Sequence, residues 1–126
     1  MTKKLLPQEK RSYWVNKTDR LFSHLVKSLG HWKCVETGAT QSIQTAHIIS
    51  RSYFNIRWDF DNAIPLSASR HRYYTDRPVE WKRFINHHFG EGYYEKLEDR
   101  ALVSKVWSLE AVKEVYENLR RFGTER

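Results

Sequence analysis

Hydrophobic residues near the start of the chain recur at the spacing of an α-helix. Between Gln8 and Leu29 the apolar side chains fall broadly on one side of a helix: Trp14, Val15, Leu21, Phe22, Leu25, Val26 and Leu29. Pro7 precedes this stretch and Gly30 follows it, and both residue types are common at helix boundaries. The pattern predicts an N-terminal helix, either continuous or broken near residues 16–19.

The middle of the chain, from residue 31 to residue 67, has no helical periodicity. Cys34–Gly38 reads as a turn, and Ile43–Ile49 reads as a short β-strand. Ser50–Asp61 mixes polar and aromatic residues without a clean period, which indicates a loop. Asn62–Leu66 could form a second short strand, whose proline places it at a sheet edge or at the end of a strand.

Helical patterns return after Leu66. The sequence predicts helices over Ala68–Thr75, over Val79–Phe89 with Pro78 opening it and Gly90 ending it, over Gly92–Leu97 and over Leu109–Phe122. The predicted class is therefore α+β. We expect a single domain over residues 1–126, with a helical arm at 1–30, a core at 31–77 and C-terminal helices at 78–126.

Composition limits the classes of protein that this chain can be. Its 126 residues suit one domain, and the chain has 22 Lys and Arg against 15 Asp and Glu, a net charge of +7. A basic protein favours polyanions such as nucleic acid, although charge alone also fits a protein without any particular partner. The sequence shows neither a membrane-spanning apolar run nor a signal-peptide core, so we expect no membrane contact and a cytoplasmic protein. The only cysteine, Cys34, excludes an intrachain disulfide.

The stretch with the most chemistry lies between residues 34 and 77. His47 follows a predicted strand, Asn62 comes fifteen residues later, and His71 comes nine residues after that. A hairpin leading into a helix would bring the two histidines towards one another, and the asparagine amide could tie the loop between the strands. A neutral imidazole can accept a proton from water near neutral pH, and Arg51 lies close enough in sequence to contact a phosphate.

These residues resemble the HNH (ββα-metal) endonuclease family, and within it the phage NinG-type recombination endonucleases. The resemblance rests on Ala46-His47-Ile-Ile-Ser-Arg51, on Arg57-Trp58-Asp59, and on Asn62 and His71 in that order. It covers about forty-five residues, a little over a third of the chain. It implies a small ββα-metal core between an N-terminal helix and a C-terminal helical extension. It also implies that His47 is the general base, Asn62 the middle asparagine and His71 a metal ligand.

The sequence departs from this family in two places. The zinc knuckle of the family would need cysteines at four positions that here hold Cys34, Thr37, Ser67 and Arg70. Three of the four ligands are missing, so we expect no structural zinc. Many members also have an acidic or histidine metal ligand before the base, where this chain has Ala46. Asp59 or Asp61 could supply a carboxylate from the loop instead.

The resemblance implies a metal-dependent DNA endonuclease that hydrolyses phosphodiester bonds in phage or prophage DNA processing or recombination. Such a protein would work in the bacterial cytoplasm or in a phage-infected host cell. The expected cofactor is a divalent metal ion, Mg²⁺ first, with Mn²⁺, Ni²⁺ or Zn²⁺ as alternatives. The expected partner is DNA, contacted by Arg51, Arg70, Arg72 and Arg77, and both a monomer and a homodimer remain open. The alternatives are an HNH scaffold that binds DNA without cutting it and a protein-interaction module.

Tyr73 and Tyr74 leave two interpretations open. They follow His71 closely in the predicted site helix, so they could either pack that helix or line a DNA groove.

Overall fold

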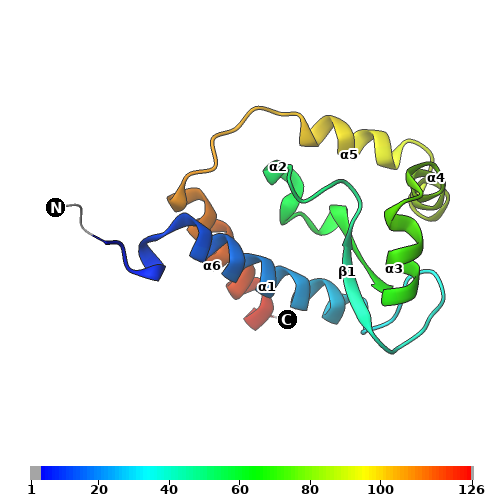
Figure 1. The fold of residues 1–126 in the computed structure, drawn as a ribbon, viewed down its shortest axis with the longest axis horizontal. Helices are drawn as coiled ribbons and strands as arrows, with labels where there is room; N and C mark the ends of the chain where they lie inside the picture. Colours follow the sequence, from blue (N-terminus) through cyan, green and yellow to red (C-terminus); the bar gives the residue numbers. More distant parts are fainter. Residues whose placement is uncertain (1–3, 126) are drawn as a thin grey trace. The chain divides into compact units, whose positions relative to one another are not determined.

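The computed structural model describes residues 4–125 of the chain as an α+β protein with a small antiparallel sheet (Figure 1). The elements in chain order are η1 (Pro7–Glu9), α1 (Arg11–Leu29), β1 (Ile43–His47), α2 (Phe54–Arg57), η2 (Phe60–Asn62), β2 (Ala63–Ser67), α3 (Ala68–Thr75), α4 (Pro78–Phe89), α5 (Tyr93–Ala101) and α6 (Leu109–Glu125). The label η marks a short 3₁₀-helix. In the part of the chain that is described, no helix is long and apolar enough to cross a membrane.

The N-terminal helix α1 is continuous from Arg11 to Leu29, without the break near residues 16–19 that the sequence left open. Thr18 lies in that region and is fully buried. Its hydroxyl donates to the carbonyl oxygen of Trp14 at 2.6 Å, so its polar group is satisfied within the helix itself. The polar residues near this point therefore do not interrupt the helix.

The sheet consists of β1 and β2, which pair antiparallel from Ile43 opposite Ser67 to His47 opposite Ala63. Pro65 lies opposite Thr45, and its carbonyl oxygen accepts a hydrogen bond from the Val35 amide at 2.9 Å. Both strands of a two-stranded sheet are edge strands, and an edge strand tolerates proline because the missing backbone N–H has no neighbouring strand to pair with on its outer side.

The boundaries of the middle elements differ from the predicted ones. The first strand ends at residue 47, two residues earlier than predicted, and β2 runs one residue further than predicted. The segment 50–61, predicted as a loop, contains the single helical turn α2 and the start of η2. Ile56 and Trp58 are buried there, and this burial gives the segment a defined local structure that its mixed composition does not reveal.

The chain divides into two compact units. Unit 1 comprises Met1–Leu25 and Lys105–Arg126, and unit 2 comprises Val26–Ser104. These boundaries differ from the divisions expected at residues 30 and 77. The reason is that the last helix packs with the first one, a contact between the two ends of the chain that hydrophobic periodicity cannot specify.

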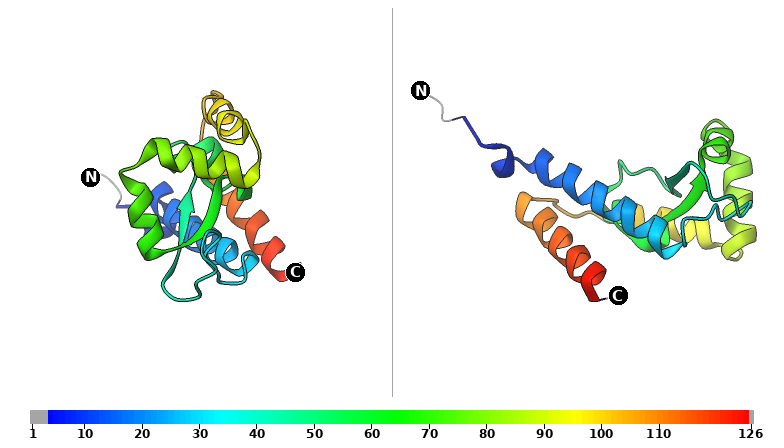
Figure 2. Two further views of the ribbon diagram at one scale, coloured as in Figure 1. Left: turned by 90° about the vertical axis from the view of Figure 1, so that its right-hand side faces the viewer. Right: turned by 90° about the horizontal axis from the view of Figure 1, so that it is seen from below.

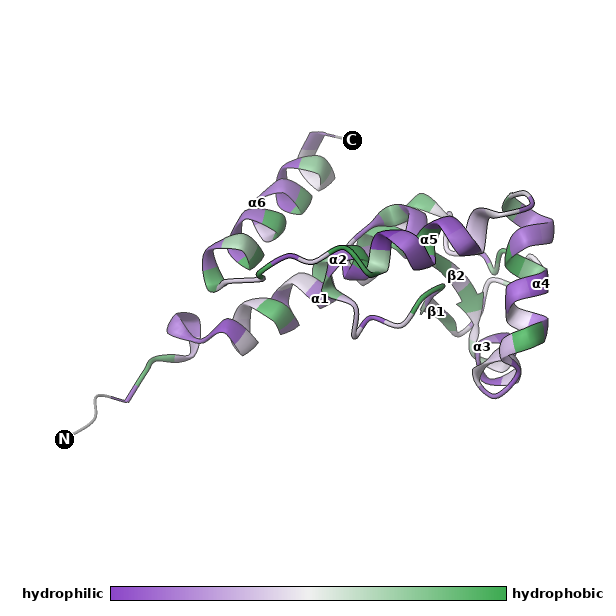
Figure 3. Ribbon diagram, turned by 90° about the horizontal axis from the view of Figure 1, so that it is seen from above, coloured by the Kyte–Doolittle hydropathy of each residue, from purple (hydrophilic) through white to green (hydrophobic). Residues whose placement is uncertain are grey.

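Unit 1 is built on α1 and α6, which run in the same direction (Figure 2). The ring of Trp14 meets that of Tyr116 at 5.4 Å between centroids, and Arg11 donates to the Trp107 carbonyl at 2.8 Å. Further along, a Cβ placed on Gly123 would lie 3.2 Å from the Leu25 side chain. Both helices alternate hydrophobic and hydrophilic positions, as helices with one buried face do (Figure 3).

Unit 2 holds a hydrophobic core between the sheet and the helices that follow it. Its members are Cys34, Ala46, Ile48, Ile49, Ile56, Ile64, Leu66, Ile85, Leu97 and Ala101. Leu66 of β2, Ile85 of α4 and Leu97 of α5 are almost fully buried. The core therefore joins the sheet to helices whose core residues lie up to 54 residues beyond His47 in β1, the strand that carries the candidate base, and it fixes the surroundings of that residue.

Candidate functional site

His47 is the last residue of β1 and is half-buried. Its Nε2 atom lies 2.9 Å from the carbonyl oxygen of Arg57, at the end of α2. A carbonyl oxygen can only accept, so this contact requires the proton of a neutral imidazole to be on Nε2. The lone pair of the ring then resides on Nδ1, which is the basic atom of the side chain.

Asn62 is fully buried, and its side-chain amide makes three hydrogen bonds to the backbone. Oδ1 accepts from the Ile49 amide at 2.8 Å, while Nδ2 donates to the carbonyl oxygens of Ile49 at 3.0 Å and of Ile56 at 3.1 Å. One side chain thus joins the segment after β1, the turn α2 and the start of β2. These bonds hold the loop that carries the Arg57 carbonyl next to His47.

His71 is the fourth residue of α3, the helix that begins directly after β2. Ser67 caps this helix, with its hydroxyl accepting from the Arg70 amide at 3.4 Å. The Nδ1 atom of His71 lies 2.8 Å from Oε1 of Gln44 in β1, so Nδ1 carries the proton and the lone pair is on Nε2. Burial lowers the pKa of His71 and favours this neutral form at neutral pH.

The two histidines line one pocket of about 170 Å³, formed by β1, α3 and α4. The lining residues are Ala46, His47, His71, Tyr74, Thr75 and Trp81. Trp81 donates from its indole nitrogen to the Ile48 carbonyl at 2.9 Å, which holds α4 against the end of β1. The tertiary structure thus brings together two histidines that are 24 residues apart in the sequence.

The two aspartates suggested as metal ligands do not line this pocket. Asp59 and Asp61 both form ion pairs with Arg100 of α5, the second at 3.2 Å. Asp59 also accepts from the Asp61 amide at 2.9 Å. Within residues 4–125, no group of three His, Cys, Asp or Glu side chains is placed so that it could hold a metal ion. The carboxylates therefore neutralise an arginine in this structure and do not join the histidines.

Two of the four arginines expected to contact DNA, Arg70 and Arg77, make cation–π contacts with the ring of Tyr73. The guanidinium carbons of Arg70 and Arg77 are 4.2 and 4.1 Å from the centre of the Tyr73 ring. Arg70 also pairs with Glu36, and Arg77 pairs with Asp76 at 3.1 Å. Both side chains are thus held in position by neighbours, and their charges are partly compensated.

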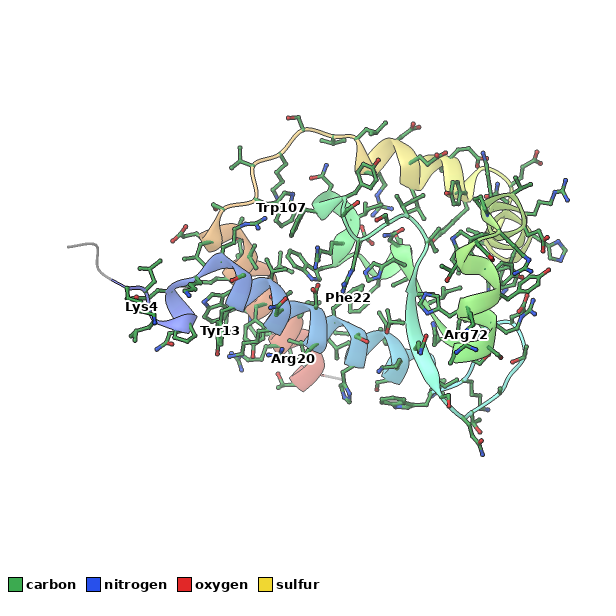
Figure 4. The ribbon with its side chains drawn as sticks, viewed as in Figure 1. Lys4, Tyr13, Arg20, Phe22, Arg72 and Trp107 are labelled. Carbon is green, nitrogen blue, oxygen red and sulfur yellow. The ribbon has the colours of Figure 1, made fainter. Side chains whose placement is uncertain are left out.

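The other two arginines are exposed. Arg72 lies on α3 (Figure 4) and borders a second hollow, which Arg70 also lines. Arg51 follows β1, and its carbonyl oxygen accepts from the Arg57 side chain at 3.1 Å. The four arginines therefore do not form one cluster around the two histidines.

The residues at the four positions where a zinc knuckle would need cysteines lie near other polar contacts. Glu36 accepts hydrogen bonds from Arg70 and from the Tyr74 hydroxyl. Cys34 is buried beside them. Burial acts to raise the pKa of its thiol, but hydrogen bonds, the largest from Thr37, outweigh burial and bring this pKa to about 7. A charged and hydrogen-bonded network thus connects the turn before β1 to α3.

Of the two tyrosines left open by the sequence, Tyr74 packs the site helix. Its ring stacks on Phe84 at 5.5 Å and lies 5.1 Å from that of Trp81. Tyr73 remains at the surface of α3, where its hydroxyl donates to Glu80.

Sequence reasoning missed three residues of the site, namely Gln44, Thr75 and Trp81. Two of them had a signal in the sequence. Gln44 shares a strand face with Ala46, and Thr75 follows His71 by one helical turn and donates to its carbonyl at 2.8 Å. Trp81 had no such signal, because only the packing of α4 brings it to the pocket.

In comparisons with known proteins, the chain matched no family model, no curated protein and no solved structure.

Proposed function

We propose that this protein is a metal-dependent DNA endonuclease of the HNH type, with His47 as the general base. One observation carries the proposal: His47 and His71 line the same pocket, and each is held by a hydrogen bond that fixes its tautomer. The chain order of strand, loop, strand and helix around them agrees with a ββα-metal core. The resemblance to phage nucleases adds a role in phage or prophage DNA processing or recombination.

The chemistry follows from the tautomer of His47. Nδ1 takes a proton from a water molecule as the water oxygen attacks the phosphorus atom, and the bond from phosphorus to the leaving sugar oxygen breaks. The Arg57 carbonyl steadies the positive imidazolium that forms, since its hydrogen bond to Nε2–H strengthens with the charge. General base catalysis of this kind contributes about a hundred- to ten-thousand-fold.

The proposed metal fits the site in part. His71 offers Nε2 with its lone pair, and Gln44 orients the ring from the other side as an outer partner of a metal-binding histidine does. When bound, a divalent ion would stabilise negative charge on the phosphate and on the leaving oxygen. Imidazole suits Ni²⁺ or Zn²⁺ better than Mg²⁺, the ion expected first from the sequence, because Mg²⁺ prefers oxygen ligands. Water and phosphate oxygens would complete the coordination.

A second candidate function is DNA binding without cleavage. It is favoured by Ala46, which is 1% exposed and offers no ligand, and by the pairing of Asp59 and Asp61 with Arg100. In that case the fold would retain its affinity for nucleic acid, and the two histidines would only connect the strand, the loop and α3. A protein-interaction role remains the third alternative.

The deciding experiment is cleavage of supercoiled plasmid and of branched DNA with Mg²⁺, Mn²⁺, Ni²⁺ or Zn²⁺, with an EDTA control. We expect nicking that His47→Ala abolishes and that His87→Ala, a change at an exposed histidine of α4, leaves intact. Circular dichroism of each variant checks the fold. Nicking that survives His47→Ala would refute the assigned base. Salt-sensitive DNA binding without cleavage by any metal would support the second candidate.

A further inference from the structure

The excess positive charge of the chain is unevenly divided between its two units. The segments of unit 1 contain 11 Lys and Arg and six Asp and Glu, whereas unit 2 contains 11 and nine. Five of the seven net positive charges therefore belong to unit 1, which does not contain the histidine pocket. A search for a polyanion-binding surface thus starts with unit 1.

Within unit 1, one face of α1 carries the cations Lys17 and Arg20. Tyr13, Lys17, Arg20 and His24 follow one another at intervals of four, three and four residues, which places them on one side of the helix. We call these four residues the α1 stripe. Figure 4 shows Tyr13 and Arg20 on the side of α1 opposite to the buried Phe22. The only acid of α1, Asp19, falls about 100° or more around the helix from each of the four.

The other helix of unit 1 has the opposite character on its outer face. Val112 and Leu119 of α6 are buried, and the side away from them carries mostly carboxylates: Glu110, Glu114, Glu117 and Glu125. Arg120 on α6 pairs with Glu117, and Arg121 bonds to Asn118. With Lys113, α6 therefore has three cations against four carboxylates, whereas α1 has four cations against one carboxylate.

Aromatic rings accompany the cations of the stripe. The Lys17 ammonium lies 4.8 Å from the ring centre of Tyr116, 5.1 Å from that of Trp14 and 5.7 Å from that of Tyr13. These rings hold the lysine in place without neutralising its charge. Arg20 and His24 are exposed beyond it.

We propose that the α1 stripe is a nucleic-acid-binding surface that contacts the phosphate backbone without reading its sequence. The stripe spans about 16 Å along the helix axis, a length of duplex DNA that carries about ten phosphate charges. Lys17 and Arg20 contact phosphates, and Tyr13 and His24 can donate hydrogen bonds to them. This inference is independent of the proposed nuclease activity, because it concerns other residues and requires no cleavage.

A basic helix can also lie on an anionic membrane, but the burial of α1 argues against that partner. A helix at a membrane surface inserts its apolar face into the lipid. Here Val15, Phe22 and Leu25, the apolar face of α1, are 7%, 1% and 4% exposed. No apolar side is left for the bilayer, whereas phosphate contacts need only the polar side.

The test measures binding of the full chain to a fluorescent DNA duplex of arbitrary sequence, by anisotropy in EDTA over about 50 to 200 mM salt. The variant Lys17→Gln with Arg20→Gln loses two charges on the stripe. The matched control, Arg120→Gln with Arg121→Gln, loses two charges on α6. We expect the stripe variant to bind about tenfold or more weakly and to lower the slope of log K against log salt by about 1.8, while the control stays near the wild type.

Lys17 is half-buried, so its substitution could also disturb folding, and a second pair of variants separates loss of binding from loss of folding. Arg20→Glu changes only an exposed side chain, and Arg121→Glu is its control on α6. We expect a strong loss of binding for the first and little for the second, with equal thermal unfolding. The proposal is overturned by a wild type that does not bind DNA or by equal losses in the stripe variants and their controls. Stripe-dependent binding to phosphatidylserine vesicles without binding to DNA would also overturn it.

Discussion

Asn62 shows how much one buried polar side chain decides in this protein. Its amide satisfies one backbone donor and two backbone acceptors in a loop of mixed sequence, where no regular ladder is present to do so. Removal of the amide leaves these buried groups without a partner, and that costs more than the loss of an exposed hydrogen bond.

We expect Asn62→Ala to lower the free energy of unfolding by about 2 to 4 kcal/mol. Urea denaturation followed by tryptophan fluorescence measures the change. Asn118→Ala, at an exposed position of α6, serves as the control and should change it by about 0.5 kcal/mol or less. A difference of less than about 1 kcal/mol between the two variants would mean that the loop does not depend on this amide.

Glycine is required at position 30 because there is no space for a side chain there. A Cβ at this position would lie 2.5 Å from the Cγ atom of Pro65, so the end of α1 packs directly on the ring of a β2 residue. We expect Gly30→Ala to destabilise the protein by about 1 to 3 kcal/mol, because the proline ring cannot rotate away.

Gly123→Ala is the matched comparison for Gly30→Ala. Its new Cβ would approach only the end of the Leu25 side chain at 3.2 Å, and alanine favours the helix by about 1 kcal/mol. Thermal unfolding of both variants should therefore rank Gly30→Ala as clearly the less stable. The reverse order would contradict the close contact between α1 and β2.

At the scale of elements, the link between the turn at residues 34–38 and α3 is electrostatic. Burial acts to raise the pKa of Glu36, but hydrogen bonds from Arg70 and Tyr74 together outweigh it and hold this pKa below its ordinary value. A carboxyl group with a lowered pKa in the folded state stabilises the protein above its unfolded pKa of about 4.3. That contribution is lost as the pH falls through the lower, folded pKa.

We expect Glu36→Gln to reduce stability at neutral pH by about 1 to 2 kcal/mol, because a neutral amide accepts weaker hydrogen bonds from Arg70 and Tyr74. The variant should also lose less stability than the wild type between neutral pH and acid pH. Urea unfolding at a series of pH values measures both effects. Parallel pH profiles for the two proteins would show that the Glu36 network does not join the turn to α3.

At the scale of the whole molecule, the chain leaves unit 2 and completes unit 1 through a short segment without regular structure. Leu102 follows α5 directly. Further along the segment, Val103 and Val106 are 62% and 85% exposed. Lys105 lies between these two valines and is exposed. Proteases cut exposed, irregular segments in preference to helices.

We expect limited trypsin digestion of the native protein to cut after Lys105 before any other site within residues 11–125. The fragment that carries α6 should remain bound to the rest, since Val112 and Leu119 are buried in unit 1. Mass spectrometry identifies the cut, and gel filtration of the nicked protein tests the association. An earlier cut inside α1 or α6, for example after Lys17 or Lys113, would contradict the helical pairing.

The sequence by itself determined the longer helices, the two strands and much of the local order of the site. Helical periodicity and the punctuation by Pro78 and Gly90 placed α4, and the same rules placed α1, α3 and α6 within a few residues. The order of His47, Asn62 and His71 singled out the stretch that forms the pocket. These features depend on local spacing, and local spacing can be read directly from the chain.

Only the tertiary structure decided which side chains meet. It paired Asp59 and Asp61 with Arg100, and it brought Trp81 to the histidine pocket. It also joined α6 to α1 across about 90 residues of chain, which separated unit 1 from unit 2. The physical reason is the same in each case: packing and charge pairing act between residues that are distant in sequence, and no local pattern specifies their partners.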